Sequence, residues 1–567
     1  MTRTPSLIGS VVALAAILTG CSAGGASTGP AAADTPVPVA VSGTPGITAA
    51  AALAENAAPD PGDIRDAASS AVRVTLTGDS AIADSEAVRI DGDTVTITAP
   101  GTYLLGGELA GQVVVDSPSA GEVVVVLSDA SITSGAGAAL VFADVDAAAV
   151  VLADGTQNTL TSAALFADST AADAPNAALF SRADLTIGGS GSLAVHAPSL
   201  DGIAATDGLV ITEGTVRVAA ADDGIRGKDH LVIDGGTITV TSGGDALKSD
   251  NDTAPDAGYI AIAAGTLALA AGGDGLTAHT DIVITGGTLA VTTGGGRGTP
   301  MAQDASAKGL KAGANLVIEG GTTTIDAAED AIHSGSVVSL NEGAITAAAG
   351  DDGVHADDTV TVAGGRLVIP ASNEGIEGAA VTIAGGNSTV TAADDAINVA
   401  DQVAPDQGTR PAGLLSITGG TLVLDAGGDG LDSNGSVEMT GGTVTVWGPA
   451  GDGNGSLDVD GGFALSGGIL LAAGSAGMAA APDAEAAQGW VQANVSGEAG
   501  AVIQITDGTA VLAEYTAEKS FANVVFSSEA IAAGTSYAVQ VDGVVTTVSA
   551  NQATAGGGPG PGRGPRR

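Results

Sequence analysis

Apolar and polar residues alternate in short runs through most of the chain, and pairs of glycine separate these runs at regular intervals. The copy LVIDGGTITVTSGGDALKSD, which starts at Leu231, shows the pattern clearly. If this copy forms one coil, Leu231, Ile233, Ile238, Val240 and Leu247 point to its inside, and the glycines turn the backbone between short strands. One copy of the pattern therefore predicts one coil.

The pattern repeats with a countable period. The second glycine of the GGT-like turn recurs with a commonest step of 22 residues, as from Gly214 to Gly236. Self-similarity at this period, with short β runs and no helical pattern, is typical of a solenoid. The sequence predicts an all-β fold, a right-handed, single-stranded parallel β-helix of about 22 residues per coil. We expect insertions at 250–258, 295–309 and 402–412, all following the acidic turn along one edge.

The pattern changes along the chain, and its changes predict the domain boundaries. Alternation begins near residue 71, becomes strictly periodic near residue 183, and is lost near residue 487. Stretches rich in Ala, Pro and Gly precede and follow it, and such sequences cannot bury enough apolar surface to fold. The predicted segments are a lipoprotein signal peptide (1–20), a disordered Ala/Pro-rich tether (21–70), N-terminal β-helix coils with a cap (71–182), regular coils with acidic turns (183–486), a small C-terminal antiparallel β module (487–552), and a disordered Gly/Pro/Arg tail (553–567).

The first residues have the layout of an export signal. An apolar run follows Arg3 and ends at LTGC, whose Cys21 is the only cysteine of the chain, and this tetrapeptide resembles a bacterial lipoprotein box. The run is short for a bilayer crossing, so a transmembrane anchor is the less favoured interpretation. We expect cleavage before Cys21, a lipid on its sulfur, and an extracytoplasmic protein anchored to the cell membrane.

Composition narrows the range of partners. The formal net charge of −46 argues against binding of nucleic acid or anionic lipid surfaces by simple electrostatics. Acidic charge serves solubility or the binding of divalent cations. Aromatic residues make up 2% of the chain, too few for the flat aromatic rows that grip neutral crystalline polysaccharides, which disfavours cellulose as the main ligand.

An acidic residue lies nine positions after the turn glycine in eight copies of the repeat. Because neighbouring coils of a β stack are about 4.8 Å apart, a constant offset aligns these carboxylates in a column. Two neighbouring charges then repel by roughly 3 kcal/mol at an effective dielectric constant near 20. We therefore expect a cation in the column, which contains Asp223, Asp245, Asp274, Asp330, Asp352, Glu374, Asp395 and Asp429.

Three consecutive copies without an insertion carry the highest density of oxygen donors. Calcium takes roughly six to eight oxygen ligands in a flexible shell, and stacked turns can supply several of them. We expect Ca²⁺ at this cluster, while the alternative is that the aspartates only close turns through side-chain to backbone hydrogen bonds. The cluster consists of Asp351, Asp352, Glu374, Glu377, Asp394, Asp395 and Asn398.

Several motifs carry a resemblance to a known family. In this order and on this period, KGLKAGANLVIEGG, DAIHSG, DDGVHADD, EGIEG and DDAINVAD resemble the bacterial carbohydrate-binding domain-containing proteins, from about residue 75 to about residue 550. The resemblance implies a parallel β-helix similar in fold to family 9 polysaccharide lyases, calcium in the turns, and affinity for acidic polysaccharide such as polygalacturonate. An acidic chain can hold an acidic polymer if divalent ions bridge the two. We therefore expect a non-catalytic, calcium-dependent carbohydrate-binding protein.

Two other functions stay open. In family 9 lyases a lysine near calcium is the base, so the resemblance makes a calcium-assisted pectate lyase one alternative. Its candidate bases are Lys228, Lys248, Lys308 and Lys311, of which Lys248 and Lys311 occupy equivalent positions, and the competing interpretation for each is a surface ion pair with aspartate. The other alternative is a surface adhesin or structural protein that calcium merely rigidifies.

Three histidines lie in or beside the acidic turns. For His279, His333 and His355 we expect exposure to solvent or a hydrogen bond to aspartate. Ligation of a transition metal is the less favoured interpretation.

Overall fold

The computed structural model describes residues 46–62, 64, 70–166, 174–302, 305–400 and 413–554. The predicted signal peptide, Cys21 and its lipid, residues 21–45 of the predicted tether, the insertion at 402–412 and residues 555–567 of the predicted tail lie outside the described residues. Within the described ranges, no helix combines the length and the apolarity that a membrane crossing requires.

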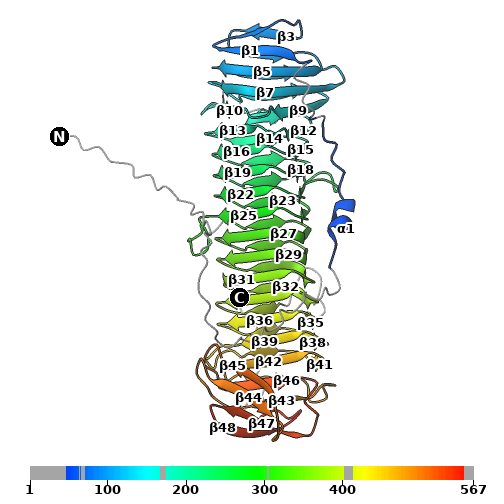
Figure 1. The fold of residues 1–567 in the computed structure, drawn as a ribbon, viewed down its shortest axis with the longest axis vertical. Helices are drawn as coiled ribbons and strands as arrows, with labels where there is room; N and C mark the ends of the chain where they lie inside the picture. The colour runs from blue at the N-terminus through cyan, green and yellow to red at the C-terminus, as the bar shows by residue number, and fades with distance from the viewer. Residues whose placement is uncertain are drawn as a thin grey trace, which may run out of the picture. The chain divides into compact units, whose positions relative to one another are not determined.

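Parallel strands stacked in coils form most of the structure, as the sequence predicts (Figure 1). Each regular coil contributes three strands, one to each of three faces, and every strand pairs with its equivalents in the coils before and after. In the coil predicted from Leu231, these are β18 (His230–Ile233), β19 (Thr237–Ser242) and β20 (Leu247–Ser249). The parallel β-helix is thereby confirmed.

The first face begins with β1 (Val72–Gly78), β5 (Gly101–Leu109), the start of β7 (Glu122–Thr133) and β9 (Ala147–Leu152). It continues with β12 (Leu185–Gly188), β15 (Gly208–Ile211), β18, β21 (Tyr259–Ile262), β24 (Ile282–Ile284), the starts of β27 (Asn315–Ala327) and β29 (Val337–Ala349), and the ends of β30 (Val354–Val362) and β32 (Ile376–Ile383). Its last strands are β35 (Leu414–Ile417), β38 (Ser436–Met439) and β41 (Phe463–Leu465).

The second face contains the end of β7, β10 (Gln157–Thr161), β13 (Ser192–Ala197), β16 (Thr215–Ala220), β19, β22 (Thr266–Ala271), β25 (Thr288–Thr293), and the ends of β27 and β29. It ends with β31 (Arg366–Ser372), β33 (Asn387–Ala392), β36 (Thr421–Ala426), β39 (Thr443–Trp447) and β42 (Ile469–Gly474).

The third face contains β4 (Thr94–Ile97), β6 (Gln112–Asp116), β8 (Leu140–Asp144), β11 (Ala177–Ser181), β14 (Asp201–Ala205), β17 (Ile225–Gly227), β20 and β23 (Leu276–Ala278). It continues with β26 (Leu310–Ala312), β28 (Ile332–Ser334), the starts of β30 and β32, β34 (Ile397–Val399), β37 (Leu431–Ser433) and β40 (Leu457–Val459).

The inside of the coils is filled by aliphatic side chains from all three faces. Leu231, Ile233, Ile238, Val240 and Leu247, the five residues predicted to point inward, are all buried. They belong to a continuous cluster that runs from the first coils to Trp490. Stacking therefore supplies the apolar burial that a single coil lacks.

The glycine of each GGT-like turn is required by its backbone conformation. Gly236 has a φ of 90°, and its equivalents from Gly214 to Gly442 also have positive φ. An added Cβ at Gly236 would lie 2.8 Å from the carbonyl oxygen of Gly214 in the coil before. Only glycine meets both the positive φ and the close approach, which explains the repeating period.

Residues 46–62, here named the strap, differ from the disordered tether expected over 21–70. They contain the helix α1 (Ala49–Ala54), whose Ala49 and Ala52 are buried against Val283 and Val317 of the first face. This contact with the apolar outer surface of β24 and β27 orders a segment whose composition alone predicts disorder (Figure 1).

Hydrogen bonds hold the strap across many coils of the first face. At one end Gly46 N donates to Asn341 Oδ1 at 3.1 Å, and at the other Gly62 N donates to Thr186 Oγ1 at 2.7 Å. The strap thus runs from β29 back to β12, against the direction in which the coils stack. Between these ends the Tyr259 hydroxyl donates to the Ala57 carbonyl at 2.8 Å.

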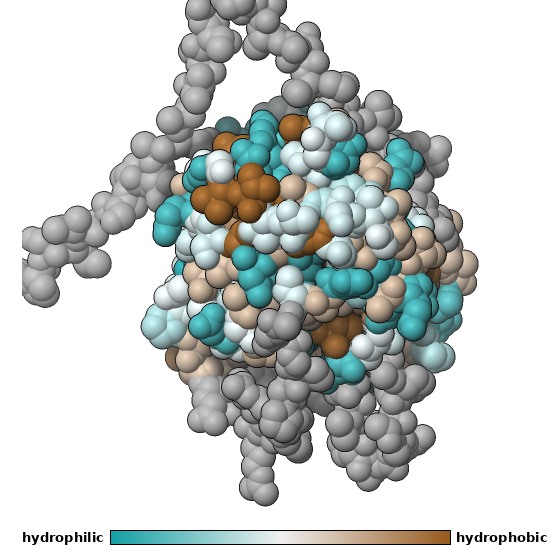
Figure 2. All heavy atoms as spheres, turned by 90° about the horizontal axis from the view of Figure 1, so that it is seen from below, coloured by the Kyte–Doolittle hydropathy of each residue, from teal (hydrophilic) through white to brown (hydrophobic). Residues whose placement is uncertain are grey.

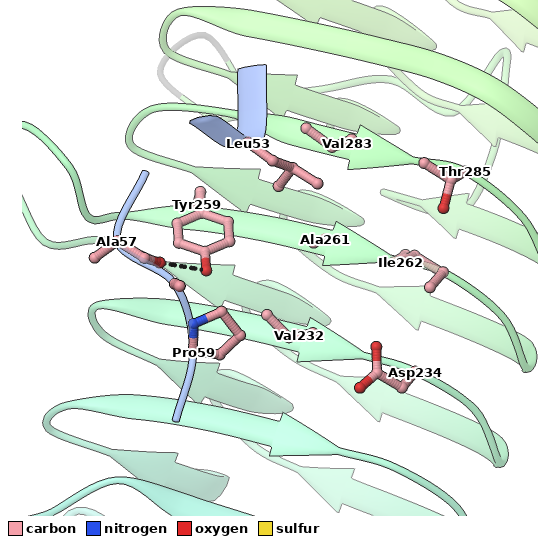
Figure 3. A pocket seen from close by; sticks show the side chains of 12 residues that line it. Leu53, Ala57, Pro59, Val232, Asp234, Tyr259, Ala261, Ile262, Val283 and Thr285 are labelled. Carbon is pink, nitrogen blue, oxygen red and sulfur yellow. Dashed lines mark hydrogen bonds between the residues drawn. The ribbon is translucent and has the colours of Figure 1, made fainter. Parts of the chain in front are cut away.

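A cavity of about 250 Å³ lies between the strap and the first face. Leu53 and Pro59 of the strap flank Tyr259, while Val232 and Val283 form the floor (Figure 3). The lining is almost entirely apolar, so the cavity belongs to the packing of the strap rather than to the acidic edge.

The insertions do not all lie at the same edge. Residues 250–258 follow the third face, between β20 and β21. Residues 295–309 instead join β25 to β26, so this insertion leads from the second face to the third and contains the acidic turn position, which Lys308 occupies. The expectation that every insertion follows the acidic turn is therefore wrong for 295–309.

Antiparallel strands close both ends of the stack. At the first end β2 (Ala81–Ala83) pairs with β1, and β3 (Val88–Asp91) pairs with β4. At the other end β46 (Asn523–Ser527) pairs with β42 and with β43 (Trp490–Ala493). A four-stranded sheet follows, in the order β45 (Val511–Thr516), β44 (Val502–Thr506), β47 (Ser536–Val541), β48 (Val544–Ser549).

The predicted C-terminal antiparallel module is thereby confirmed. Viewed from this end, the surface mixes polar and apolar side chains (Figure 2). A module of this kind covers the open edge of the last coil, where unpaired strand edges would otherwise bind other chains.

Candidate functional site

The predicted column of acidic residues exists as a ladder along the turn between the second and third faces. Each member lies two residues before an apolar residue that pairs in register with its equivalents, as Asp223 before Ile225 and Asp245 before Leu247. Several members are nearly buried, with 3% of Asp274 and 2% of Asp330 exposed. This acid ladder consists of Asp201, Asp223, Asp245, Asp274, Asp330, Asp352, Glu374, Asp395 and Asp429, and Lys308 occupies the position between Asp274 and Asp330.

One oxygen of most ladder aspartates serves the backbone. Asp223 Oδ1 accepts from the backbone N–H of Asp245 at 2.9 Å, Asp274 Oδ1 accepts from the backbone N–H of Lys308 at 2.8 Å, and Asp429 Oδ1 accepts from the backbone N–H of Gly455 at 2.5 Å. The interpretation of these aspartates as turn-closing residues is thus correct for Oδ1. It leaves Oδ2 available for a cation.

A second column runs beside the acid ladder, three residues further along each coil. Its members are register partners on the third face, and all of them are half-buried. This companion column consists of Arg226, Lys248, Thr277, Lys311, His333, His355, Glu377, Asn398, Asp432 and Asp458.

Lysine side chains supply the cation in the first half of the ladder. Lys248 Nζ lies 3.0 Å from Asp223 Oδ2 and 3.1 Å from Asp245 Oδ2. Lys311 Nζ lies 3.1 Å from Asp274 Oδ2. In the ladder itself, Lys308 Nζ lies 2.5 Å from Asp330 Oδ2. The predicted Ca²⁺ ligands Asp223, Asp245, Asp274 and Asp330 therefore already have ammonium partners.

These ion pairs bear on the proposed catalytic lysines. Burial lowers the pKa of Lys248, but the charges and hydrogen bonds of Asp245 and Asp223 outweigh it, so the pKa is raised above its ordinary value. The pKa of Lys308 is raised in the same way, by Asp330 and Glu329 against burial. A general base has to be deprotonated, so this environment disfavours Lys248 and Lys308 in that role.

Histidines are the partners in the middle of the ladder. His333 Nδ1 lies 2.9 Å from Asp330 Oδ2, and His355 Nδ1 lies 3.2 Å from Asp352 Oδ2, which confirms the predicted hydrogen bonds to aspartate. Burial lowers the pKa of His355, but Asp352 and Glu377 raise it to about 9 overall. His279 is exposed and belongs to none of the clusters of potential metal ligands among the described residues.

The last third of the ladder lacks a basic partner within the described residues. Between Arg366 and Lys519 the sequence contains one basic residue, Arg410, which lies outside them. Asp395, Asp429 and Asp432 place carboxylate oxygens within 4.8 Å of one another. This trio is the part of the ladder that most needs a cation from solution.

The pKa values of these three carboxyls are consistent with the lack of a basic partner among the described residues. Burial, together with the charges of Asp395, Asp429 and Asp458, raises the pKa of Asp432 to about 8. Burial is also the main cause that raises the pKa of Asp429 to about 7 and that of Asp395 to about 6. Without a cation, each carboxyl resists ionisation because it is buried and because its neighbours are also acidic.

The structure divides the seven residues of the predicted cluster. Asp351 and Asp394 are exposed at the turn. Asp352 faces His355, while Glu374 Oε2 accepts a hydrogen bond from Asn398 Nδ2 at 2.6 Å. Glu377 lies next to His355 in the companion column. Of the seven, only Asp395 joins the cation-poor trio, together with the predicted Asp429.

Sequence reasoning did not single out Asp201, Asp432 or Asp458. Asp201 begins the ladder, and its Oδ1 accepts from the N–H of Asp223 at 3.2 Å. Asp432 and Asp458 share the position of Lys248 and Lys311 in the companion column. An offset of three from the ladder position, counted along the sequence, is the signal that could have identified Asp432 and Asp458.

Fold and site together define a parallel β-helix with an acidic ladder along one edge. A model of the family "Carbohydrate-binding domain-containing protein" matches residues 91–353 and 348–558. The chain therefore belongs to the carbohydrate-binding domain-containing protein family.

Two individual proteins are similar to parts of the chain. A "Carbohydrate-binding domain-containing protein" from Acetivibrio thermocellus is 34% identical over 151 residues, which cover 26% of this chain and 53% of the relative. The chain thus spans about half the length of this curated relative. The solved structure described as "polysaccharide lyase-like protein from C. thermocellum, Gadolinium derivative" is 32% identical, with a TM-score of 0.39, and covers 40% of this chain and 92% of that one.

Proposed function

We propose that this protein binds acidic polysaccharide of the polygalacturonate type through Ca²⁺, without cleaving it. The observation that carries the proposal is the trio of Asp395, Asp429 and Asp432, which has no basic partner among the described residues. Membership of a carbohydrate-binding family supports a glycan as the partner. With a net charge of −46, the chain would repel an acidic polymer unless a divalent cation bridged the two.

The donor set of the trio fits calcium. It offers carboxylate oxygens alone, the hard ligands that Ca²⁺ prefers. Asp429 Oδ1 already accepts from Gly455, so Asp429 Oδ2 and the oxygens of Asp432 would hold the ion, with Asp395 beside them. Asp458, the register partner of Asp432 in the next coil, adds charge nearby. Bound calcium would supply a positive centre at the edge that attracts uronate carboxylates.

The proposal is tested by affinity electrophoresis in gels that contain polygalacturonate. We expect calcium to retard the full chain, and chelator to abolish the retardation. Asp432→Asn should lose most of the calcium-dependent shift, while Asp84→Asn, which changes an exposed aspartate near the first end, should behave as the wild type. Equal retardation in calcium and in excess chelator would contradict the proposal.

The lyase and adhesin alternatives give different results in the same preparation. β-Elimination produces an unsaturated uronide that absorbs ultraviolet light, so its absence supports a binding protein. Its appearance, and its loss in Lys311→Ala or Lys248→Ala, would establish a lyase instead. A rise in melting temperature with calcium, combined with no glycan retained on a polysaccharide array, would indicate an adhesin or structural protein.

We also propose that the chain is exported and anchored to the cell membrane by a lipid on Cys21. The apolar run before LTGC supports this localisation. Labelled palmitate should enter the wild-type protein in bacterial cells, and Cys21→Ser should abolish the labelling. A labelled Cys21→Ser protein would contradict the anchor.

A further inference from the structure

A groove of about 290 Å³ lies beside the acid ladder, between an insertion and the turns of the coils that follow it. One wall is the first part of the insertion 295–309, which leaves the stack after β25 (Figure 1). The floor comes from the turns of four successive coils, each one or two residues before a ladder position. The floor residues are Ala328, Gly350, Asn373 and Ala393.

The groove is extended along the stack. Because coils lie about 4.8 Å apart, four successive turns span roughly 14 Å. This shape suits a segment of a linear polymer, whereas pockets for small molecules enclose most of their ligand. At one end of the groove, Ala393 lies two residues before Asp395 of the cation-poor trio, so one polymer can extend from the groove toward the trio.

Backbone contacts hold the wall of the groove at Arg297. The glycines on either side, Gly296 and Gly298, have positive φ, which side-chain-bearing residues rarely adopt. The backbone N–H of Arg297 donates to Asp326 Oδ1 at 2.7 Å, and the backbone N–H of Thr299 donates to the carbonyl of Gly296 at 3.1 Å. These contacts fix the backbone of Arg297 beside the floor.

The side chain of Arg297 is exposed, and no described residue forms an ion pair with its guanidinium. The lysines along the same edge differ from it, because Lys248, Lys308 and Lys311 each pair with a ladder aspartate. The donors of the Arg297 guanidinium are therefore free to bind a carboxylate from outside the chain.

We propose that the groove binds a segment of the acidic polysaccharide, and that the guanidinium of Arg297 pairs directly with one uronate carboxylate. The planar fork of an arginine matches a carboxylate with two parallel hydrogen bonds. The inference rests on the proposed function, because polygalacturonate is the partner in both. It adds a second contact, in which no calcium ion lies between the two charges.

The charges around the groove set the orientation of the sugar. Asp351 and Asp394 directly follow the floor residues Gly350 and Ala393, and both aspartates are exposed. Their carboxylates repel a uronate carboxylate but accept hydrogen bonds from sugar hydroxyls. The uronate carboxylate therefore faces the wall at Arg297, and hydroxyl groups face the acidic turns.

The test is a calorimetric titration of oligogalacturonate into the calcium-saturated full chain. Arg297→Gln should weaken binding roughly 10-fold, the size of one hydrogen bond to a charged group. Arg297→Lys should restore only part of the affinity, because lysine keeps the charge and lacks the fork. Arg366→Gln removes the same charge from an exposed position on the second face outside the groove, and it should bind as the wild type. Calcium affinity without glycan should be equal in Arg297→Gln and the wild type.

A second pair of variants tests the shape of the groove without changing its charge. Ala393→Leu places a larger side chain in the floor and should weaken binding of the oligomer. Ala344→Leu, an exposed alanine of β29 outside the groove, is the matched control and should leave the affinity unchanged.

The outcomes separate this inference from the proposed function. Wild-type affinity in both Arg297→Gln and Ala393→Leu would overturn the groove as a subsite and leave calcium-dependent binding intact. Equal losses in Arg297→Gln and Arg366→Gln would also overturn it, because they would show an effect of net charge. If the wild type itself does not bind oligogalacturonate in calcium, the proposed function fails, and the subsite fails with it.

Discussion

At the scale of single residues, the two oxygens of a ladder aspartate have different tasks. In Asp223, Oδ1 accepts from the backbone of the next coil, whereas Oδ2 faces Lys248. In Asp429, Oδ1 has the same backbone role, but no described residue provides a cation for Oδ2. The same structural side chain is therefore neutralised in one coil and open to a dissolved ion in another.

The raised pKa values of the cation-poor carboxyls predict a dependence of stability on pH. Asp432 has a pKa of about 8 and Asp429 of about 7 in the folded chain, against 3.8 in an unfolded one. Between these values the folded state binds more protons, so its free energy of unfolding decreases as pH rises from about 4 to about 8. Thermal unfolding in chelator should show a lower Tm at pH 8 than at pH 5.

Two comparisons control this prediction. Excess calcium should reduce the decrease in Tm, because the ion replaces the protons. Asp432→Asn in chelator should also reduce it, because a residue with a raised pKa has been removed. A Tm in chelator that rises over the same pH range would show that these carboxyls are ionised without difficulty.

Lys248 provides a second prediction at this scale. Lys248→Gln leaves Asp223 and Asp245 without their ammonium partner, and we expect it to lower the free energy of unfolding by about 1 to 3 kcal/mol. The first half of the ladder should then respond to calcium, since its charges resemble those of the last third. Unfolding of the variant with and without calcium measures how much calcium raises its free energy of unfolding, compared with the wild type.

Lys519→Gln is the matched control for that experiment. Lys519 Nζ pairs with Asp425 Oδ1 at 2.6 Å, and Asp425 is not a member of the acid ladder. Its removal should therefore give no additional calcium response. An equal gain in both variants would show that the response comes from net charge rather than from the ladder.

At the scale of single residues, the sequence predicts only part of the candidate site. The constant offset of nine predicts the ladder, because the period of a stack converts sequence spacing into alignment in space. Which coil carries its own cation depends on the register of a second position, three residues further along. Lys248 and Lys311 occupy this second position in their coils and pair with ladder aspartates. In a later coil Asp432 occupies the same position, and the lack of a basic residue there becomes clear only when both columns are aligned.

At the scale of elements, local conformation explains why the coils were predictable and the strap was not. The turn glycines have positive φ and close backbone contacts, so each coil requires a glycine at the same position and can be recognised by it in the sequence. The helix α1 is six residues of alanine and leucine, with no period and few polar signals. Its order comes from contact with β24 and β27. These strands lie far away in the sequence, so the contact cannot be predicted from the local pattern.

The strap supplies a prediction with a closely matched control. Ala52 is fully buried against the first face, whereas Ala51, its neighbour on α1, is exposed. Ala52→Glu should release the strap, because it would bury a charge without a partner, and Ala51→Glu should not. Limited proteolysis should cleave residues 46–62 much faster in Ala52→Glu alone. Equal cleavage rates would show that the packing of α1 does not hold the strap.

At the scale of the whole molecule, the companion column divides the acid ladder into three zones. In the first zone a lysine pairs with Asp245, and in the second a histidine pairs with Asp352. In the third zone, around Asp429, no described residue of the companion column is basic. Because each coil contacts only its neighbours, stability along a solenoid is local. Removal of calcium should therefore act mainly on the last zone.

Hydrogen exchange followed by mass spectrometry can test this zoning. In chelator we expect faster exchange in β34, β37 and β40, and little change in β17 and β20. The first zone serves as an internal control, since its cations are part of the chain. Uniform acceleration along the stack would show that calcium acts on the fold as a whole rather than on the last zone.

The path of the strap imposes an order on the formation of this molecule. Gly46 is made early in synthesis, but its partner Asn341 lies 295 residues later in the chain. The first face must be assembled as far as β29 before that hydrogen bond can form. The segment that leaves the ribosome before every coil can thus dock along its full length only after the coils from β12 to β29 have formed, so a fully docked strap shows that these coils are complete.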